Sequence, residues 1–223
     1  MKIVLLHGAL GCEKQLLPLK DALVHEGFHA DTVNFSGHGG IHTDELSIQQ
    51  FAEELERTVS DTGNTTIFGF SMGGYVALYL ATTGRLKASK IITLGTKLNW
   101  SPESAAQEIK NLNPEKIREK VPAFASYLES LHGENWPRLL TQTAEMMQTM
   151  GENPPLTESN LPDVQIPVVA MRGEKDVMVS EEETLWAVNL LPNASYLAVP
   201  DWQHPIDRIP LEALVKQLKN HLV

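Results

Sequence analysis

Cysteine is almost absent from this chain of 223 residues, since Cys12 is the only one. A single thiol excludes an internal disulfide and is compatible with a reducing compartment. We interpret Cys12 as a buried or bystander thiol, not as a nucleophile.

Long hydrophobic runs are also lacking. No stretch approaches the ~18 consecutive apolar residues of a membrane-spanning helix. The apolar run near the start covers only residues 3–6, which is too short for a signal peptide, and no small-residue cleavage site follows it. We therefore expect a cytoplasmic protein.

Basic residues are scarce: 18 Lys and Arg stand against 28 Asp and Glu, for a formal net charge of −10. This balance disfavours nucleic acid and anionic membranes as partners. The sequence shows no metal-ligand cluster, and the glycine-rich residues 37–40 fit neither a phosphate-binding loop nor a dinucleotide fingerprint. We expect no metal or cofactor, a small-molecule substrate, and a monomer or homodimer.

Short apolar runs alternate with amphipathic stretches along most of the chain, which is typical of a mostly parallel sheet with helices on both faces. About six strands are predicted, at residues 2–6, 28–35, 65–70, 90–95, 166–171 and 195–199. Helices are predicted at residues 15–26, 47 to about Ser60, 72–83, 181–190 and 211–221.

The alternation is interrupted at residues 98–160, where only helical patterns occur. These cover residues 102–112, 114–131 and 136–150, and a loop-like stretch follows at residues 151–155. We interpret this segment as a helical cap inserted into a core formed by residues 1–97 and 161–223. Such a cap is expected to fold over the carboxyl edge of the sheet, where open α/β sheets bind ligands.

Residues 69–73 have the form G-x-S-x-G and lie between a predicted strand and a predicted helix. A serine exposed on a sharp strand-to-helix turn has strained backbone, and the residues two before and two after it crowd together, so glycine suits both positions. The helix N-terminus offers free N–H groups and a positive dipole end to a developing oxyanion. Ser71 is therefore the predicted nucleophile.

A serine nucleophile requires a base and a carboxylate that orients the base. His204 follows the last predicted strand, and Asp176 follows the strand before it. With Ser71 they occupy the carboxyl ends of strands, in the chain order Ser, Asp, His of this architecture. Glu174 and Asp201 are the alternative carboxylates. The competing histidines are His25, His29, His132 and His221, and each lies on a predicted helix or beside a helix end.

Acyl transfer also needs an oxyanion hole. The Met72 N–H, directly after the nucleophile, is the first expected donor. The second is expected from the loop after the first strand, with the Ala9 N–H as candidate and Leu10 as the alternative. His7 is interpreted as a support for this loop through hydrogen bonds.

These motifs together resemble the α/β-hydrolase superfamily over essentially the whole chain. His7-Gly8 looks like its oxyanion-loop motif, residues 36–39 are similar to its G-H-G turn, residues 69–73 to its nucleophile elbow and residues 173–176 to its G-x-x-D acid motif. His204 matches the late histidine. The resemblance implies the fold and the Ser71, Asp176, His204 triad.

Two departures narrow the implied chemistry. Serine at the elbow disfavours dehalogenase and epoxide hydrolase reactions, which use aspartate there. The stretch ending in Tyr75 is similar to that of cyclohexadiene synthases of menaquinone synthesis, which usually carry Arg where this chain has tyrosine. A lyase acting on an anionic substrate is thereby disfavoured.

The expected function is that of a carboxylesterase, which would hydrolyse a small apolar ester through an acyl-enzyme on Ser71. Its pocket is predicted from the apolar residues of the cap and the oxyanion loop, namely Leu10, Trp100, Phe124, Tyr127, Trp136, Met146, Met147 and Met150. Two alternatives remain: a lyase or C–C hydrolase with the same triad, and a ligand sensor on a hydrolase scaffold.

Overall fold

The computed structural model describes residues 1–59 and 64–222. In this part of the chain six strands form one sheet in the order β2-β1-β3-β4-β5-β6, and every neighbouring pair is parallel. The strands are β1 (Lys2–Leu6), β2 (His29–Val33), β3 (Thr65–Phe70), β4 (Lys90–Leu94), β5 (Val168–Gly173) and β6 (Ala194–Val199). The predicted α/β-hydrolase architecture with its parallel sheet is confirmed, with strand ends shifted by one to two residues.

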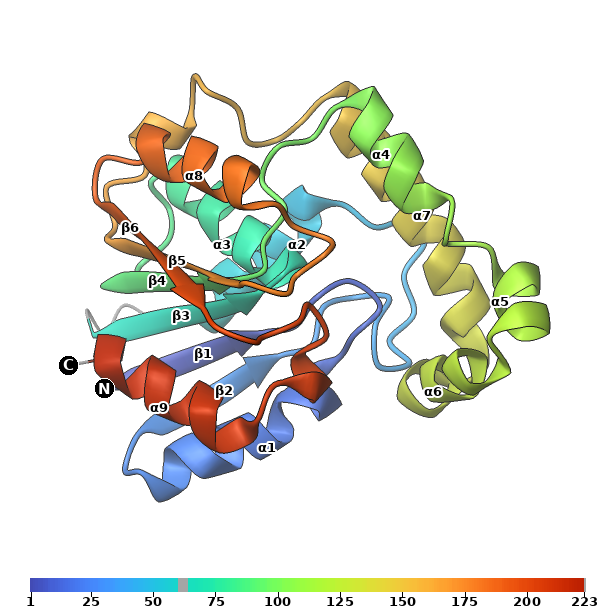
Figure 1. Ribbon diagram of the computed structural model, residues 1–223, viewed down its shortest axis with the longest axis horizontal. Helices are drawn as coiled ribbons and strands as arrows, with labels where there is room; N and C mark the ends of the chain where they lie inside the picture. Colours follow the sequence, from blue (N-terminus) through green and yellow to red (C-terminus); the bar gives the residue numbers. More distant parts are fainter. Residues whose placement is uncertain (60–63, 223) are drawn as a thin grey trace.

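Helices cover both faces of this sheet (Figure 1). One face carries α1 (Glu13–His25) and α9 (Leu211–Leu222), and the other carries α2 (Ile48–Thr58), α3 (Met72–Thr82) and α8 (Glu181–Leu190). The expected end of α2 near Ser60 lies outside the described residues. Each face has its own apolar core because alternate strand residues point to opposite sides: Val4 and Leu6 join one cluster, and Ile3 and Leu5 the other.

Four helices follow β4 and stand beyond the carboxyl ends of the strands, on the right of Figure 1. They are α4 (Pro102–Ile109), α5 (Pro114–Lys120), α6 (Pro122–His132) and α7 (Trp136–Glu152). We refer to them together as the cap. The single helix expected at residues 114–131 is wrong: it is broken into α5 and α6 at Val121, whose backbone lies at φ −139° and ψ 57°. Pro122 explains the break, because proline disfavours helical backbone in the residue before it.

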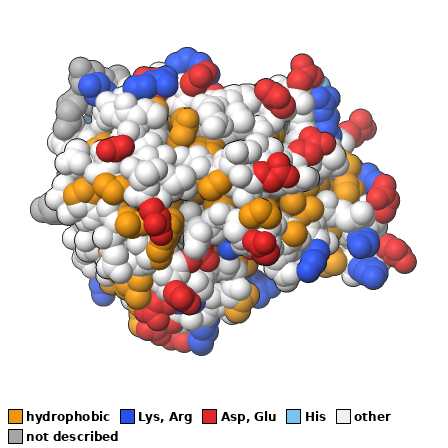
Figure 2. Space-filling view, turned by 90° about the horizontal axis from the view of Figure 1, so that it is seen from above, with side chains coloured by type: hydrophobic (Ala, Val, Ile, Leu, Met, Phe, Trp, Pro, Cys, Tyr) orange, Lys and Arg blue, Asp and Glu red, His pale blue; other side chains and the backbone are white. Residues whose placement is uncertain are grey.

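No helix within the described residues is long and apolar enough to cross a membrane. On the face shown in Figure 2, Asp and Glu side chains are spread across the surface among hydrophobic ones, and Lys and Arg lie mostly toward its rim.

Candidate active site

Ser71 sits on a sharp turn between β3 and α3. Its backbone is left-handed, at φ 50° and ψ −116°, which costs a non-glycine residue about 1–3 kcal/mol. The turn needs the glycines around it: a Cβ on Gly69 would lie 2.4 Å from the Gly74 nitrogen and 2.6 Å from the Gly73 carbonyl carbon. The crowding expected from the G-x-S-x-G spacing is therefore present, and it leaves the Ser71 side chain half-buried at the N-terminus of α3.

Asp176 and His204 form a hydrogen-bonded pair at the ends of β5 and β6. Asp176 Oδ2 lies 2.8 Å from His204 Nδ1. The other carboxylate oxygen, Oδ1, accepts the N–H groups of Met178 at 2.8 Å and Val179 at 3.0 Å. Both oxygens thus have defined partners, and the carboxylate cannot rotate freely away from the imidazole.

The charge state of Asp176 follows from these contacts. Burial by itself raises the pKa of this carboxyl, but the hydrogen bond and charge of His204, with the Val179 and Met178 N–H groups, outweigh it and lower the pKa below its ordinary value. The carboxyl is therefore ionised at neutral pH, as a residue that orients a histidine must be.

The end of β4 brings the pair to Ser71. The Ser71 N–H donates to the Leu94 carbonyl at 2.8 Å, and a Cβ on the next residue, Gly95, would lie 3.1 Å from Asp176 Oδ2 and 3.2 Å from His204 Nδ1. The ring of Phe70, which precedes Ser71, lies 5.3 Å from the His204 ring between centroids. Among residues 1–59 and 64–222, no hydrogen bond joins the Ser71 hydroxyl to His204.

The loop after β1 runs directly beside Ser71. A Cβ on Gly8 would lie 3.2 Å from Ser71 Cβ and 3.0 Å from the Phe70 ring, so a larger residue here would have to displace one of these side chains. Residues 8–11 form a turn in which the Gly11 N–H donates to the Gly8 carbonyl at 3.1 Å. The Ala9 and Met72 N–H groups donate to no acceptor within the described residues, which leaves the two expected oxyanion donors free.

His7 lies under this loop and is almost fully buried. Its Nε2 accepts the Phe35 N–H at 3.1 Å, so the proton is on Nδ1, which donates to the Gly8 carbonyl at 2.9 Å. Burial, the largest cause, lowers the pKa of His7 to about 4, although the Gly8 contact opposes the shift. The neutral ring therefore connects this loop to Phe35, two residues after the end of β2.

This burial predicts an acid-sensitive fold. Between pH 6.5 and 4, His7 is protonated in the unfolded chain but neutral in the folded chain. The free energy of unfolding should therefore fall as the pH is lowered through this window. The shift to a pKa of about 4 corresponds to about 3 kcal/mol. Urea unfolding at the two pH values measures it. His7→Gln should show a weaker pH dependence, whereas His29→Gln, at an exposed position, should match the wild type; an unchanged dependence in His7→Gln contradicts the assignment.

A small cavity of about 50 Å³ lies beneath the cap, with Ser71 in its lining. Its lining includes Ala9 and Met72 from the catalytic loops and three expected pocket residues, Trp100, Met146 and Met147. Leu10, Phe124, Tyr127 and Trp136 do not line it. Phe124 and Tyr127 stack on the exposed side of α6, where the Tyr127 hydroxyl donates to Asp207.

The lining also contains a fourth expected residue, Met150, and three residues that sequence reasoning did not place there: Ile48, Tyr75 and Lys97. Lys97 is the charged member of this lining. Its ammonium lies over the Trp100 ring, 5.7 Å from the centroid, and 3.6 Å from Glu183 and 3.9 Å from Glu108. The sequence could have indicated Lys97 as a lining residue, because it comes just after β4, at the carboxyl edge of the sheet.

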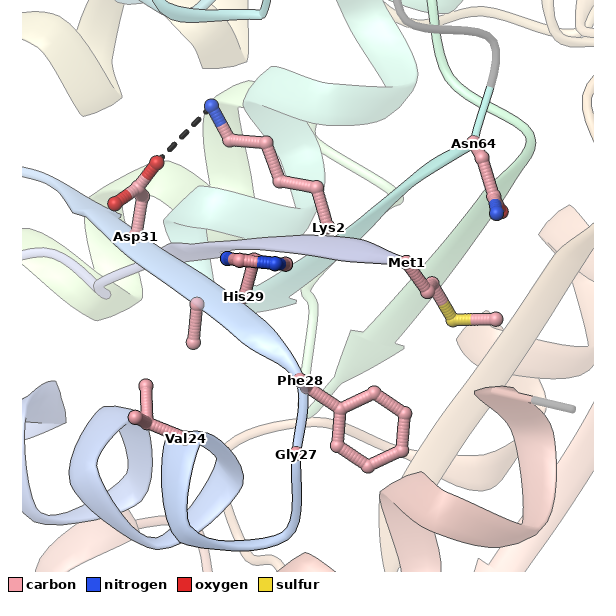
Figure 3. Close-up of a pocket in the computed structure, with 9 residues that line it drawn as sticks. Met1, Lys2, Val24, Gly27, Phe28, His29, Asp31 and Asn64 are labelled. Carbon is pink, nitrogen blue, oxygen red and sulfur yellow. Dashed lines mark ion pairs between the residues drawn. The ribbon is translucent and has the colours of Figure 1, made fainter.

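A larger groove of about 750 Å³ lies at the opposite end of the strands, where their N-terminal residues are (Figure 3). It is lined around the N-terminal ends of β1 and β2 by residues that include Val24 and Phe28, and the Lys2–Asp31 ion pair, 3.0 Å long, lies on it. None of Ser71, Asp176 and His204 borders it. The small cavity therefore marks the candidate site despite its size.

The chain is similar to a known family in sequence and to known structures in fold. The model of a family described as "Alpha/beta hydrolase family" matches residues 3–216. No curated protein sequence matches the chain. Similar solved structures include a thermophilic esterase from Thermogutta terrifontis, at 20% identity and a TM-score of 0.77, covering 100% of this chain and 89% of that one.

Two further similar structures carry related descriptions. A putative lipase from Acinetobacter baumannii AYE has 17% identity and a TM-score of 0.81, covering 99% of this chain and 83% of that one. The enol-lactonase from Burkholderia xenovorans LB400 has 17% identity and a TM-score of 0.75, with 99% and 90% covered. At these identities the likeness concerns the fold.

Proposed function

Because this chain belongs to the alpha/beta hydrolase family, we propose that it is a serine hydrolase that cleaves a small, apolar carboxylic ester. The observation that carries the proposal is the strained Ser71 turn at the N-terminus of α3, set beside the 2.8 Å Asp176–His204 pair. Strain of this kind persists at sites where it serves the mechanism.

In the first half of the reaction, His204 removes the Ser71 proton through Nε2 as Oγ attacks the ester carbonyl. Asp176 holds Nδ1 protonated and stabilises the imidazolium that forms. The Met72 and Ala9 N–H groups donate hydrogen bonds to the developing oxyanion, and the positive end of the α3 dipole adds to this stabilisation. The proton passes from His204 to the departing alcohol, which leaves an ester between Ser71 and the acyl group.

In the second half, His204 takes a proton from water as the water attacks the acyl-enzyme, and returns that proton to Ser71. The contact between the Ser71 hydroxyl and His204 is made when substrate is bound, since catalytic hydrogen bonds often tighten only in the complex.

The cavity supports a small acyl group as substrate. Its volume of about 50 Å³ and its methionine and tryptophan walls suit a short apolar chain, and methionine side chains adapt to different shapes. Esterase, lipase and enol-lactonase are the descriptions of the similar structures. Each of these names denotes cleavage of an ester bond, which agrees with the proposal.

The test is hydrolysis of p-nitrophenyl acetate, butyrate and octanoate by the purified protein. We expect turnover with acetate and a kcat/KM at least about tenfold lower with octanoate, since an extra methylene that finds no room costs on the order of 1–3 kcal/mol. Turnover of octanoate as fast as of acetate contradicts the small-acyl proposal. Absence of turnover on all three esters contradicts esterase function and favours a lyase, a C–C hydrolase or a ligand sensor.

A further inference from the structure

His132, the last residue of α6, joins the cap to two loops of the core. The ring is almost fully buried. Its Nδ1 accepts the Gly39 N–H at 2.9 Å, so the proton is on Nε2, which donates to the Leu10 carbonyl at 2.9 Å. One cap side chain thereby bonds the loop after β1 and the glycine-rich loop after β2.

The neutral ring is the form that makes both bonds, because Nδ1 must accept and Nε2 must donate. Burial, the largest cause, lowers the pKa of His132, and the nearby Lys14 acts in the same direction, while the Leu10 contact opposes it. Neutrality at pH 7 thus agrees with the geometry.

Leu10 occupies a strained position. Its φ of 59° places it in the left-handed region, at the third residue of the turn 8–11, where glycine is the usual choice. A leucine keeps such backbone only when its surroundings hold it there. Here the cap holds it twice: its carbonyl is bonded to His132, and its side chain packs on the apolar cap cluster that contains Leu128 and Trp136.

The same turn lies against Ser71, through Gly8. We infer that His132 is a positioning residue that holds the loop of residues 8–11 in the conformation that presents the Ala9 N–H to the oxyanion. The oxyanion hole is then complete only while α6 is docked on the core. This inference rests on the proposed function, because it assigns a role within an acyl-transfer site.

Two variants separate the two bonds of His132. In His132→Asn the side-chain oxygen takes the place of Nδ1 and keeps the Gly39 bond, but the Leu10 bond is lost. In His132→Gln the side-chain nitrogen takes the place of Nε2 and keeps the Leu10 bond, but the Gly39 bond is lost.

We expect His132→Asn to lower kcat for p-nitrophenyl acetate about 10- to 100-fold with little change in KM, approaching the ~10²–10³-fold loss of a whole oxyanion donor. His132→Gln should stay within about threefold of the wild type. Arg138→Met is the matched control, because Arg138 also bonds the cap to the core, at His42 and Asp44, and none of its bonds among the described residues goes to residues 8–11; its kcat should not change. Equal losses in the Asn and Gln variants overturn the inference.

Hydrogen exchange tests the same bonds without reference to activity. The Gly39 amide should exchange faster in His132→Gln and the Gly11 amide faster in His132→Asn. Unchanged Gly11 exchange in His132→Asn overturns the inference. If the wild type has no Ser71-dependent esterase activity while these exchange changes occur, the proposed function fails and the loop contact stands.

A third variant guards against a general loss of stability. Asparagine tolerates left-handed backbone, so in a Leu10→Asn background the turn depends less on His132. We expect His132→Asn to cost less in kcat there than in the wild type. An equal cost in both backgrounds overturns the inference.

Discussion

Replacement of Ser71 with alanine is expected to abolish ester hydrolysis, with kcat reduced by at least ~10³-fold and up to the order of 10⁶-fold. Without the hydroxyl no acyl-enzyme forms, and the remaining oxyanion donors support only attack by water. Steady-state hydrolysis of p-nitrophenyl acetate measures the loss. Mass spectrometry after reaction with an organophosphonate should find the label on Ser71 in the wild type and no adduct in the variant.

The fold of this variant should remain intact, because alanine tolerates the Ser71 backbone no worse than serine does. Ser71→Gly should raise the free energy of unfolding by roughly 1 kcal/mol or more, since glycine adopts φ 50° without strain. Ser195→Ala, at an exposed serine of β6, serves as the control. Residual activity of Ser71→Ala above about a tenth of the wild type would place the nucleophile elsewhere.

Asp176→Asn is expected to lower kcat by about 10⁴-fold with a small effect on KM. The Met178 and Val179 N–H groups fix Oδ1 as an acceptor, so the amide nitrogen of asparagine must take the place of Oδ2. That nitrogen donates to His204 Nδ1 and drives the proton to Nε2, where the ring can no longer accept a proton from Ser71. The loss comes from the wrong tautomer in an unchanged structure.

The alternative carboxylates supply the matched controls. Asp201 is largely exposed and lies 2.5 Å from Lys175, and Glu174 is exposed. Asp201→Asn and Glu174→Gln should therefore keep kcat within a few-fold of the wild type. If either lowers kcat as much as Asp176→Asn does, the acid of the triad has been misassigned.

Local patterns in the sequence were enough to predict the layers of the fold. Buried parallel strands are near-continuous apolar runs, and β3 with its following glycines and α3 can be identified from residues 65–83 alone. Parallel strands all end at one edge, so the placement of Ser71, Asp176 and His204 after three strands predicted their convergence. The Asp176–His204 hydrogen bond agrees with that expectation.

The role of each apolar residue in the cap was harder to predict from sequence, because such a residue can either pack the cap helices together or line the cavity. The periodicity of apolar residues predicted helices there. Pro122 is the sequence signal for the break between α5 and α6, which the prediction of one helix at residues 114–131 did not take into account. The periodicity did not distinguish Met146 and Met147, which line the cavity, from Phe124 and Tyr127, which lie on the exposed side of α6.

The elements, their order and the chemistry at their ends could be predicted from local sequence, because they depend on residues close together in the chain. The contacts between cap and core became visible in the folded molecule. The bond from His132 to Leu10 joins residues 122 positions apart. Lys97 lines the cavity, where its ammonium contacts the Trp100 ring and Glu183, a residue of α8. Such contacts depend on how whole helices dock, and no local pattern encodes them.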